Sequence, residues 1–135
     1  MHDEDRTPRS RASTARQRLG QSGERLAAGW LEARGYRLVE RNWRCLAGEL
    51  DLVAEHDGEL VFVEVKTRRD TRLGAPEEAI TRVKRLHLIA AAQEYLAAHA
   101  MLERPYRIDV IAVELAPSGR LLGIRHYPSS IGMEE

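Results

Sequence analysis

Two short apolar runs joined by Asp57-Gly58 constrain the fold of this chain more than any other feature of its sequence. Leu50 to Ala54 and Leu60 to Lys66 are rich in valine and leucine, which favours β-strands. An Asp-Gly pair between two such runs is a strong signal for a β-hairpin with a two-residue turn. We therefore expect an antiparallel pair of strands whose register is fixed by this turn.

The rest of the chain predicts helices and further strands on either side of the hairpin. Apolar residues recur at helical spacing between Ser22, a candidate N-cap, and Gly35, which ends the pattern. The other predicted elements are a strand at Tyr36–Trp43, a helix at Glu77–His99, a strand at Tyr106–Val113 and a weaker strand at Leu121–Tyr127. This αβββαβ order indicates an α/β domain in which helices flank a mixed β-sheet.

The chain has the length of one domain with one core, at 135 residues. Residues 1–19 are rich in arginine and have no apolar period, so we predict a flexible basic arm there. The folded domain is then expected at residues 20–128, followed by a tail at residues 129–135. Cys45 is the only cysteine, which excludes an internal disulfide and a thiolate cluster for zinc.

The hydropathy pattern argues against a membrane protein. Every apolar run is broken within a few residues, whereas a membrane-spanning helix needs about 20 apolar residues. The N-terminal segment, with acidic residues followed by arginines, lacks the apolar stretch of a signal peptide. We therefore expect no membrane association and a cytoplasmic location.

Charge is balanced overall but segregated along the chain. The sequence has 21 basic and 21 acidic side chains, which argues against a protein that simply coats nucleic acid. An acidic stretch that ends at residue 65 is followed by a basic one at residues 66–85. Such runs are usually solvated faces, so they become informative only if the acidic residues converge.

The hairpin register brings acidic residues together. It places Asp51 opposite Glu64 and Glu49 opposite Lys66, with directly opposed Cβ atoms about 4.5–5.5 Å apart. Two facing carboxylates destabilise a strand pair unless a positive group lies between them. Such oxygen ligands suit a hard cation, Mg²⁺ or Mn²⁺. Lys66 projects to the same face as Glu64. At a site that hydrolyses a phosphate ester, its ammonium group would orient the attacking water or offset the negative charge that develops on the phosphate.

Two further acids have two interpretations each. Glu24 shares the helix face that Ala27 and Leu31 turn toward the core, so it either takes a partner at the site or is a first-turn acid favoured by the helix dipole. Glu49 either forms an exposed ion pair with Lys66, which is worth little, or holds the lysine in its working rotamer, the interpretation that we favour.

The residues around these acids resemble a known family. Gly23-Glu24, Gly48-Glu49-Leu50-Asp51-Leu52 and Val61-Phe62-Val63-Glu64-Val65-Lys66-Thr67-Arg68 are similar to the signature of the YraN family of uncharacterised bacterial proteins. Gly74, Pro76, Ala79-Ile80, Lys84 and Arg107-Ile108-Asp109-Val110 extend the resemblance over roughly residues 20–114. It implies the restriction-endonuclease-like fold of the PD-(D/E)xK nuclease superfamily, and a further similarity to archaeal Holliday-junction resolvases.

The resemblance also implies roles for single residues. Asp51 and Glu64 would bind the metal, with the Val65 carbonyl as a third ligand. Lys66 would be the catalytic lysine and Glu24 a helix-borne acid near the metal. Resolvases of similar fold work as dimers, so the same analogy implies a homodimer.

Basic residues that follow the predicted site are candidates for nucleic-acid binding. They would contact backbone phosphates, or they are the solvated charges of an exposed loop. These residues are Arg68, Arg69, Arg72, Lys84 and Arg85. Aromatic residues make up only 5% of the chain and do not interleave with the basic ones, which favours recognition of duplex or branched shape over stacking on single strands.

Three functions fit these features. The leading hypothesis is a divalent-metal-dependent nuclease that acts on structured DNA in repair or recombination. The second is a nucleic-acid-binding module or repair adaptor that has the nuclease fold without turnover. The third is a metal-stabilised protein with no nucleic-acid role. Opposed carboxylates favour the nuclease because a binding module does not need them, and the third function leaves the basic stretch unused.

Overall fold

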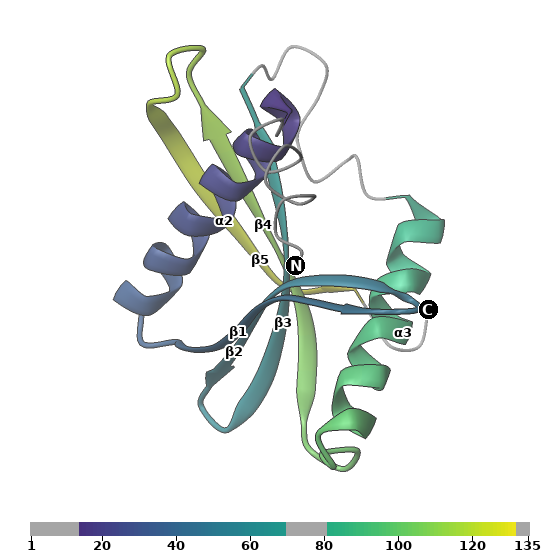
Figure 1. Cartoon of the computed structure of the whole chain (residues 1–135). Coiled ribbons are helices and arrows are strands. Elements are labelled where there is room, and N and C mark those ends of the chain that lie inside the picture. Colours follow the sequence, from purple (N-terminus) through teal and green to yellow (C-terminus); the bar gives the residue numbers. More distant parts are fainter. Residues whose placement is uncertain (1–13, 70–80, 132–135) are drawn as a thin grey trace, which may run out of the picture.

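The computed structural model describes residues 14–69 and 81–131, in which two helices and five strands follow one another (Figure 1). The elements are α2 (Ala15–Ala33), β1 (Arg37–Cys45), β2 (Gly48–His56), β3 (Glu59–Arg68), α3 (Arg82–Ala98), β4 (Tyr106–Leu115) and β5 (Leu121–Ile131). This order confirms the predicted αβββαβ core with an additional terminal strand. Arg72, Gly74, Pro76 and the predicted start of the second helix at residues 77–80 lie outside the described residues.

The five strands form one mixed sheet in the order β1-β2-β3-β4-β5. β3 and β4 pair in parallel, and every other neighbouring pair is antiparallel. Parallel neighbours need a crossover connection, and α3 lies in the connection between β3 and β4. Because α3 covers one face of the sheet and α2 covers the other, side chains on both faces of the central strand β3 are buried. This explains the unbroken buried run from Leu60 to Val65.

The predicted hairpin is present between β2 and β3. Asp57 and Gly58 have positive φ angles of 51° and 82°, as the two central residues of a type I′ turn require. Val53 lies opposite Phe62 and Leu52 opposite Val63, which is the predicted register. Leu52–Val63 is the last backbone pair of this ladder, so the two strands separate just before Asp51.

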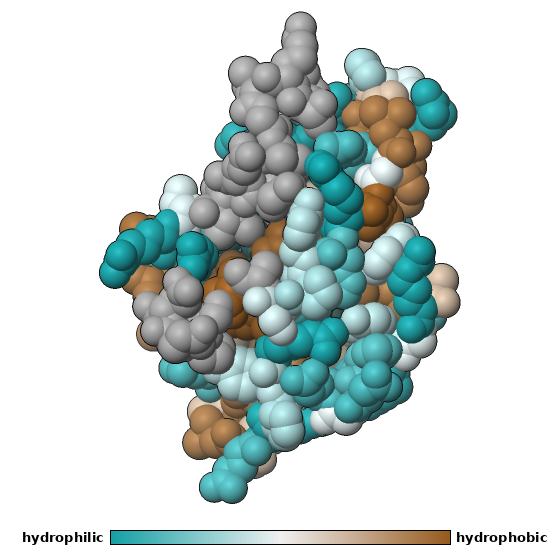
Figure 2. Space-filling model, turned by 180° about the vertical axis from the view of Figure 1, so that it is seen from behind, coloured by the Kyte–Doolittle hydropathy of each residue, from teal (hydrophilic) through white to brown (hydrophobic). Residues whose placement is uncertain are grey.

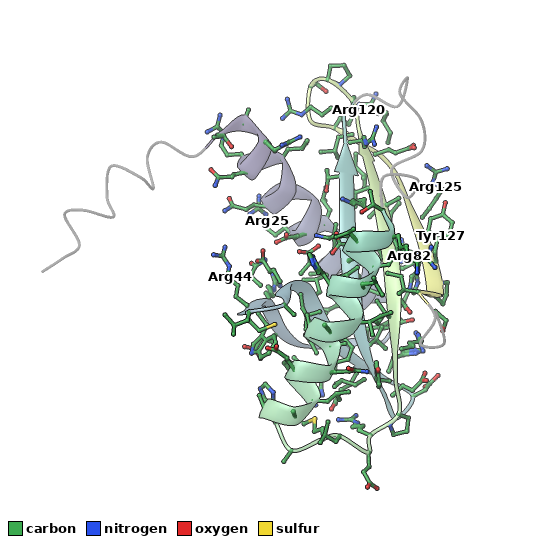
Figure 3. The ribbon with its side chains drawn as sticks, turned by 90° about the vertical axis from the view of Figure 1, so that its right-hand side faces the viewer. Arg25, Arg44, Arg82, Arg120, Arg125 and Tyr127 are labelled. Atoms are coloured by element: carbon green, nitrogen blue, oxygen red, sulfur yellow. The ribbon has the colours of Figure 1, made fainter. Side chains whose placement is uncertain are left out.

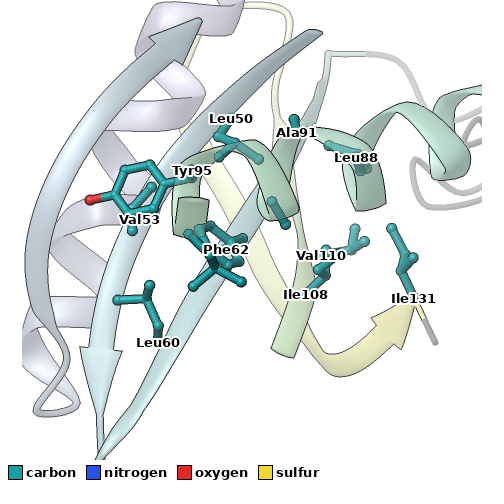
Figure 4. Close-up of a cluster of buried hydrophobic side chains, with 12 residues drawn as sticks. Leu50, Val53, Leu60, Phe62, Leu88, Ala91, Tyr95, Ile108, Val110 and Ile131 are labelled. Carbon is teal, nitrogen blue, oxygen red and sulfur yellow. The ribbon is translucent and has the colours of Figure 1, made fainter. Parts of the chain in front are cut away.

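Two apolar clusters hold the helices against opposite faces of the sheet. On one face α3 packs through Leu88, Tyr95 and Leu96, in the cluster shown in Figure 4. On the other face α2 packs through Ala27, Ala28 and Leu31. The result is a helix-sheet-helix sandwich in which each helix presents side chains to one face of β3 (Figure 1).

Helix α2 begins earlier than the sequence pattern predicted. It starts at Ala15 rather than after Ser22, so residues 15–19 of the predicted flexible arm are helical. Thr14 and Gln17 form a capping box, in which the Gln17 N–H donates to Thr14 Oγ1 at 3.0 Å and the Thr14 N–H donates to Gln17 Oε1 at 2.9 Å. This polar cap starts the helix without any apolar repeat, which is why periodicity missed it.

The last strand is longer than predicted. β5 reaches Ile131, three residues into the predicted C-terminal tail, and the Ile131 side chain is buried in the α3 cluster. Near its start, Leu121 and Leu122 are 40% and 56% exposed, and Figure 2 shows apolar side chains gathered at this end of an otherwise largely hydrophilic face. No helix among the described residues is long and apolar enough to cross a membrane.

A buried charge network joins β4 to β5. Asp109, which is fully buried, accepts hydrogen bonds from Arg107 Nε at 3.0 Å, from the Ser129 N–H at 2.8 Å and from His126 Nε2 at 2.7 Å. Desolvation acts to raise the pKa of Asp109, but the hydrogen bonds from His126, Ser129 and Arg107 outweigh it and hold that pKa below its ordinary value. The same Arg107 donates to Glu59 at 2.7 Å and to the Tyr36 hydroxyl at 2.8 Å.

Candidate active site

The carboxylate of Asp51 lies against the backbone of β3 at the point where β2 leaves it. The Val65 N–H donates to Asp51 Oδ2 at 2.8 Å, so the side chain continues the hydrogen bonding where the ladder ends. Burial, followed by the nearby Glu64 carboxylate, raises the pKa of Asp51 to about 8, although the Val65 hydrogen bond opposes the shift. The two predicted metal ligands therefore face a shared, poorly hydrated space, and each disfavours the negative charge of the other.

Glu64 is the most deeply buried acid of this site, with only 4% of its side chain exposed. Its Oε1 has no hydrogen-bond partner among residues 14–69 and 81–131. Its Oε2 lies 3.6 Å from Lys84 Nζ and 3.9 Å from Lys66 Nζ. Lys66 therefore projects to the same side of β3 as Glu64, as predicted. Lys84, which was predicted as a phosphate contact, reaches the acid itself.

Glu24 on α2 joins the site through a partner that the sequence did not suggest. Asn42 Nδ2 donates to Glu24 Oε1 at 3.0 Å. Desolvation raises the pKa of Glu24, the Asn42 hydrogen bond opposes this shift, and the carboxylates of Glu49 and Glu64 reinforce it. Four carboxylates thus converge closely enough to influence one another, and Glu24 is an acid of the site rather than an isolated helix residue.

The predicted position of Glu49 opposite Lys66 was wrong, whereas its role beside the site stays a prediction. β2 and β3 are no longer paired at this point, so Glu49 does not lie opposite Lys66. It lies opposite Arg44 in the β1–β2 ladder, and Arg44 Nε is 3.6 Å from Glu49 Oε2. Because 78% of the Arg44 side chain is exposed, this pair contributes little to stability.

A close contact between Gly23 and Thr67 sets the distance between α2 and β3. A Cβ atom at position 23 would lie only 1.8 Å from Thr67 Oγ1. Only glycine therefore allows the helix to approach the strand at this height. Since Glu24 is the next residue, this contact also determines where its carboxylate lies relative to β3. This explains why a glycine directly precedes Glu24 in the sequence.

The donor set fits a hard divalent cation. Among the described residues, no three His, Cys, Asp or Glu side chains come together as a complete metal cage. Mg²⁺, however, is usually held by only one or two carboxylates, with water and substrate phosphate as its other ligands. Asp51 and Glu64 supply this number, and Glu64 Oε1 is a buried acceptor to which none of the described side chains or N–H groups donates. The Val65 N–H donates a hydrogen bond to Asp51. The Val65 carbonyl stays a proposed metal ligand.

Further basic side chains lie on several elements of the domain. Arg68 ends β3 opposite Glu114, Arg69 follows it and is exposed, and Arg85 lines a shallow depression on α3 together with Arg82. Figure 3 shows two further arginines, Arg25 of α2 and Arg44 of β1, projecting toward one side of the molecule, with Arg82 beside the start of α3.

Three features of the site escaped the reasoning from sequence. The contact of Lys84 with Glu64 and the hydrogen bond of Asn42 to Glu24 both join elements far apart in the chain, for which a single sequence holds no signal. The third, the role of Gly23, had a usable signal. A glycine inside a helix is unfavourable, and its presence often marks a close approach to another element.

The αβββαβ core, with a five-stranded mixed sheet flanked by two helices, has the restriction-endonuclease-like fold. The model of the uncharacterised protein family UPF0102 matches residues 23–113, and the chain belongs to this family, which confirms the resemblance to YraN proteins.

Relatives of this family match most of the chain. The UPF0102 protein of Roseiflexus castenholzii is 48% identical over 117 residues, which are 86% of this chain and 94% of the relative. The one from Beutenbergia cavernae is 54% identical over 99 residues, or 73% of this chain and 84% of the relative. The one from Symbiobacterium thermophilum is 50% identical over 104 residues, or 77% and 88%.

Proposed function

We propose that this protein is a cytoplasmic, divalent-metal-dependent nuclease that hydrolyses phosphodiester bonds in structured DNA, as in repair or recombination. The observation that carries the proposal is the pair of buried carboxylates, Asp51 and Glu64. Burial makes both anions costly, and yet no described residue donates to Glu64 Oε1. A hard cation between them would remove that cost, and such a cation is the usual means of hydrolysing a phosphodiester.

Asp51 and Glu64 would hold Mg²⁺ or Mn²⁺, with the Val65 carbonyl as a further ligand. The metal would supply Lewis-acid chemistry, offsetting phosphate charge and making water a better nucleophile at neutral pH. Lys66 would orient the attacking water or stabilise the charge that develops on the phosphate. Glu24, held in place by Asn42, would be a second acceptor for water protons near the reacting atoms.

The surrounding basic residues suit a substrate with a phosphate backbone. Four described residues would contact phosphates: Lys84 and Arg85 on α3, Arg68 at the end of β3, and Arg69 directly after it. Arg72 is a proposed contact beyond the described residues. Such contacts position a duplex without reading its sequence. Paired incisions at a branch would require a homodimer, which sedimentation of the protein with and without junction DNA would detect.

The test is a cleavage assay with four-way junction, nicked and linear duplex DNA and with RNA, in Mg²⁺, in Mn²⁺ and in chelator. Cleavage that requires metal and disappears in both Asp51→Asn and Lys66→Met supports the nuclease. Glu32→Gln, an exposed acid of α2, is the matched control and should cleave as wild type does. If Asp51→Asn cleaves as well as wild type, the proposal is wrong. Gel shifts without cleavage by the wild type would favour the binding module instead.

A further inference from the structure

Two ammonium groups share one oxygen of the buried Glu64 carboxylate. Lys84 Nζ and Lys66 Nζ lie 3.6 and 3.9 Å from Oε2, while Oε1 has no hydrogen-bond partner in the part of the chain that the structure describes. A side chain that is only 4% exposed receives little help from solvent. Without a cation, the charge of Glu64 is therefore balanced chiefly by the two lysines, and a divalent cation has to compete with them.

The two lysines differ in how easily their ammonium groups can move away from the Glu64 carboxylate. Lys66 lies on the central strand β3, and 28% of its side chain is exposed. Lys84 comes from the first turn of α3, and 42% of its side chain is exposed. The Lys84 N–H donates to Thr81 Oγ1 at 3.1 Å, which fixes its backbone. Its long and partly solvated side chain is the one that can swing to a new anion without moving the sheet.

We propose that Lys84 is a positioning residue that makes cation binding at Glu64 depend on the phosphodiester substrate. In the free protein its ammonium group balances the negative charge of Glu64, as the metal does when it is bound. A backbone phosphate entering the site offers Lys84 a second anion, and the lysine moves to it. Glu64 then has an unmet charge, which the cation balances. The inference rests on the metal site of the proposed function and adds an order of events to it.

The proposal has a reciprocal consequence. If DNA tightens the binding of metal by some factor, the metal must tighten the binding of DNA by the same factor. A metal that simply bridges protein and phosphate also gives coupling, so coupling alone does not identify Lys84. The distinguishing quantity is the affinity of the DNA-free protein for metal, which should rise when the competing ammonium is removed.

The first experiment titrates Mn²⁺ into the full chain without DNA and follows free Mn²⁺ by electron paramagnetic resonance. Lys84→Met keeps the length of the side chain and removes its charge, and it should bind Mn²⁺ at least about fivefold more tightly than wild type. Lys84→Arg keeps the charge and should stay close to wild type. Arg82→Gln removes a charge from the same helix turn and should change the affinity by less than about twofold.

The second experiment measures binding of a labelled duplex by fluorescence anisotropy, in chelator and in saturating Mn²⁺, with the duplex checked for cleavage afterwards. Mn²⁺ should tighten binding at least about tenfold for wild type and less than about threefold for Lys84→Met. A structural defect would weaken binding under both conditions and would not raise the affinity for free Mn²⁺.

The outcomes separate this inference from the proposed function. If Mn²⁺ binding requires Asp51 but is no tighter in Lys84→Met than in wild type, the role of Lys84 is wrong and the metal site stands. If wild type binds no Mn²⁺ with or without duplex and does not cleave, both are wrong. Tighter Mn²⁺ binding in Lys84→Met, together with reduced coupling, supports both.

Discussion

The backbone N–H of Val65 donates to the carboxylate of Asp51 at 2.8 Å, so that an acid side chain takes the place of a strand partner. This bond holds Asp51 beside Glu64 in a space where neither carboxylate is well hydrated. The arrangement lowers the stability of the metal-free protein. Such a cost at a functional site is expected where the geometry serves a ligand rather than the fold.

The first prediction concerns pH. The pKa of Asp51 is about 8 in the fold against an ordinary value of 3.8, so the folded state binds this proton more tightly than the unfolded state does. The free energy of unfolding should therefore fall as pH rises above the ordinary value, by at most about 1.4 kcal/mol per pH unit, and level off near pH 8. Urea unfolding in chelator between about pH 5 and pH 8 measures this slope.

Asp51→Asn is the variant that tests the effect, because it removes the proton-binding group itself and leaves titrating groups remote from the site unchanged. Its slope over the same range should be shallower than that of wild type. Glu24, whose pKa is also raised, contributes a remaining slope of the same sign. Asp109 contributes none there, because its lowered pKa costs stability only when the pH falls below its ordinary range. Equal slopes would mean that Asp51 is not desolvated in the fold.

The second prediction concerns metal and stability. A cation that binds only the folded protein should raise its free energy of unfolding by about 2.7 kcal/mol at a hundredfold excess over the dissociation constant. The gain from Mn²⁺ should grow as pH rises through about 8, the pKa of Asp51, because the cation binds the ionised carboxylate. Glu64→Gln should abolish the gain, and the exposed Glu32→Gln should keep it. Chemical unfolding with and without Mn²⁺ measures it, and a full gain in Glu64→Gln would contradict the assignment.

The third prediction uses two glycines of the same helix. Gly23→Ala forces a methyl group onto Thr67, so it should destabilise the protein by about 1–3 kcal/mol and displace Glu24. A Cβ atom added at the exposed Gly29 would meet nothing within 4 Å, so Gly29→Ala should stabilise the helix by about 0.5–1 kcal/mol. Thermal unfolding of both variants checks the opposite signs. A neutral Gly23→Ala would show that α2 can shift freely.

The fourth prediction concerns Asp109, whose two oxygens both accept hydrogen bonds. Asp109→Asn replaces one acceptor by an amide donor that faces other donors, so it should cost about 2–4 kcal/mol. Glu114→Gln, which weakens the more exposed pair with Arg125, should cost less than about 1 kcal/mol. If Asp109→Asn is folded under the assay conditions, it should keep its affinity for Mn²⁺, because its role lies in the fold. Loss of metal binding by the folded variant would contradict this separation.

Local sequence signals predicted the centre of the fold well. The Asp57-Gly58 turn and the valine-rich runs around it determined the hairpin register, and β3 is buried as such a run requires. Extending this hairpin also predicted that Asp51 lies near Glu64, although the backbone ladder ends at Leu52–Val63, and strand alternation placed Lys66 on the same side as Glu64. These relationships depend on neighbours in one hairpin, where alternation and turn geometry leave little freedom.

The errors arose where that local geometry ends. Glu49 was assigned by extending the β2–β3 ladder past Leu52, but β2 is no longer paired with β3 there and stays paired with β1, where Glu49 lies opposite Arg44. The start of α2 depends on a polar cap and not on apolar spacing. The contact between Lys84 and Glu64 depends on how a crossover helix is placed over the sheet, which tertiary packing decides.

The buried network around Asp109 has a consequence for synthesis. Two of its hydrogen bonds come from His126 and Ser129 in β5, so until that strand is available Arg107 is the remaining partner of the carboxylate among the described residues. A nascent chain that still lacks β5 would carry a buried anion with part of its hydrogen bonding unmet. Completion of this domain on the ribosome should therefore wait for β5 to emerge.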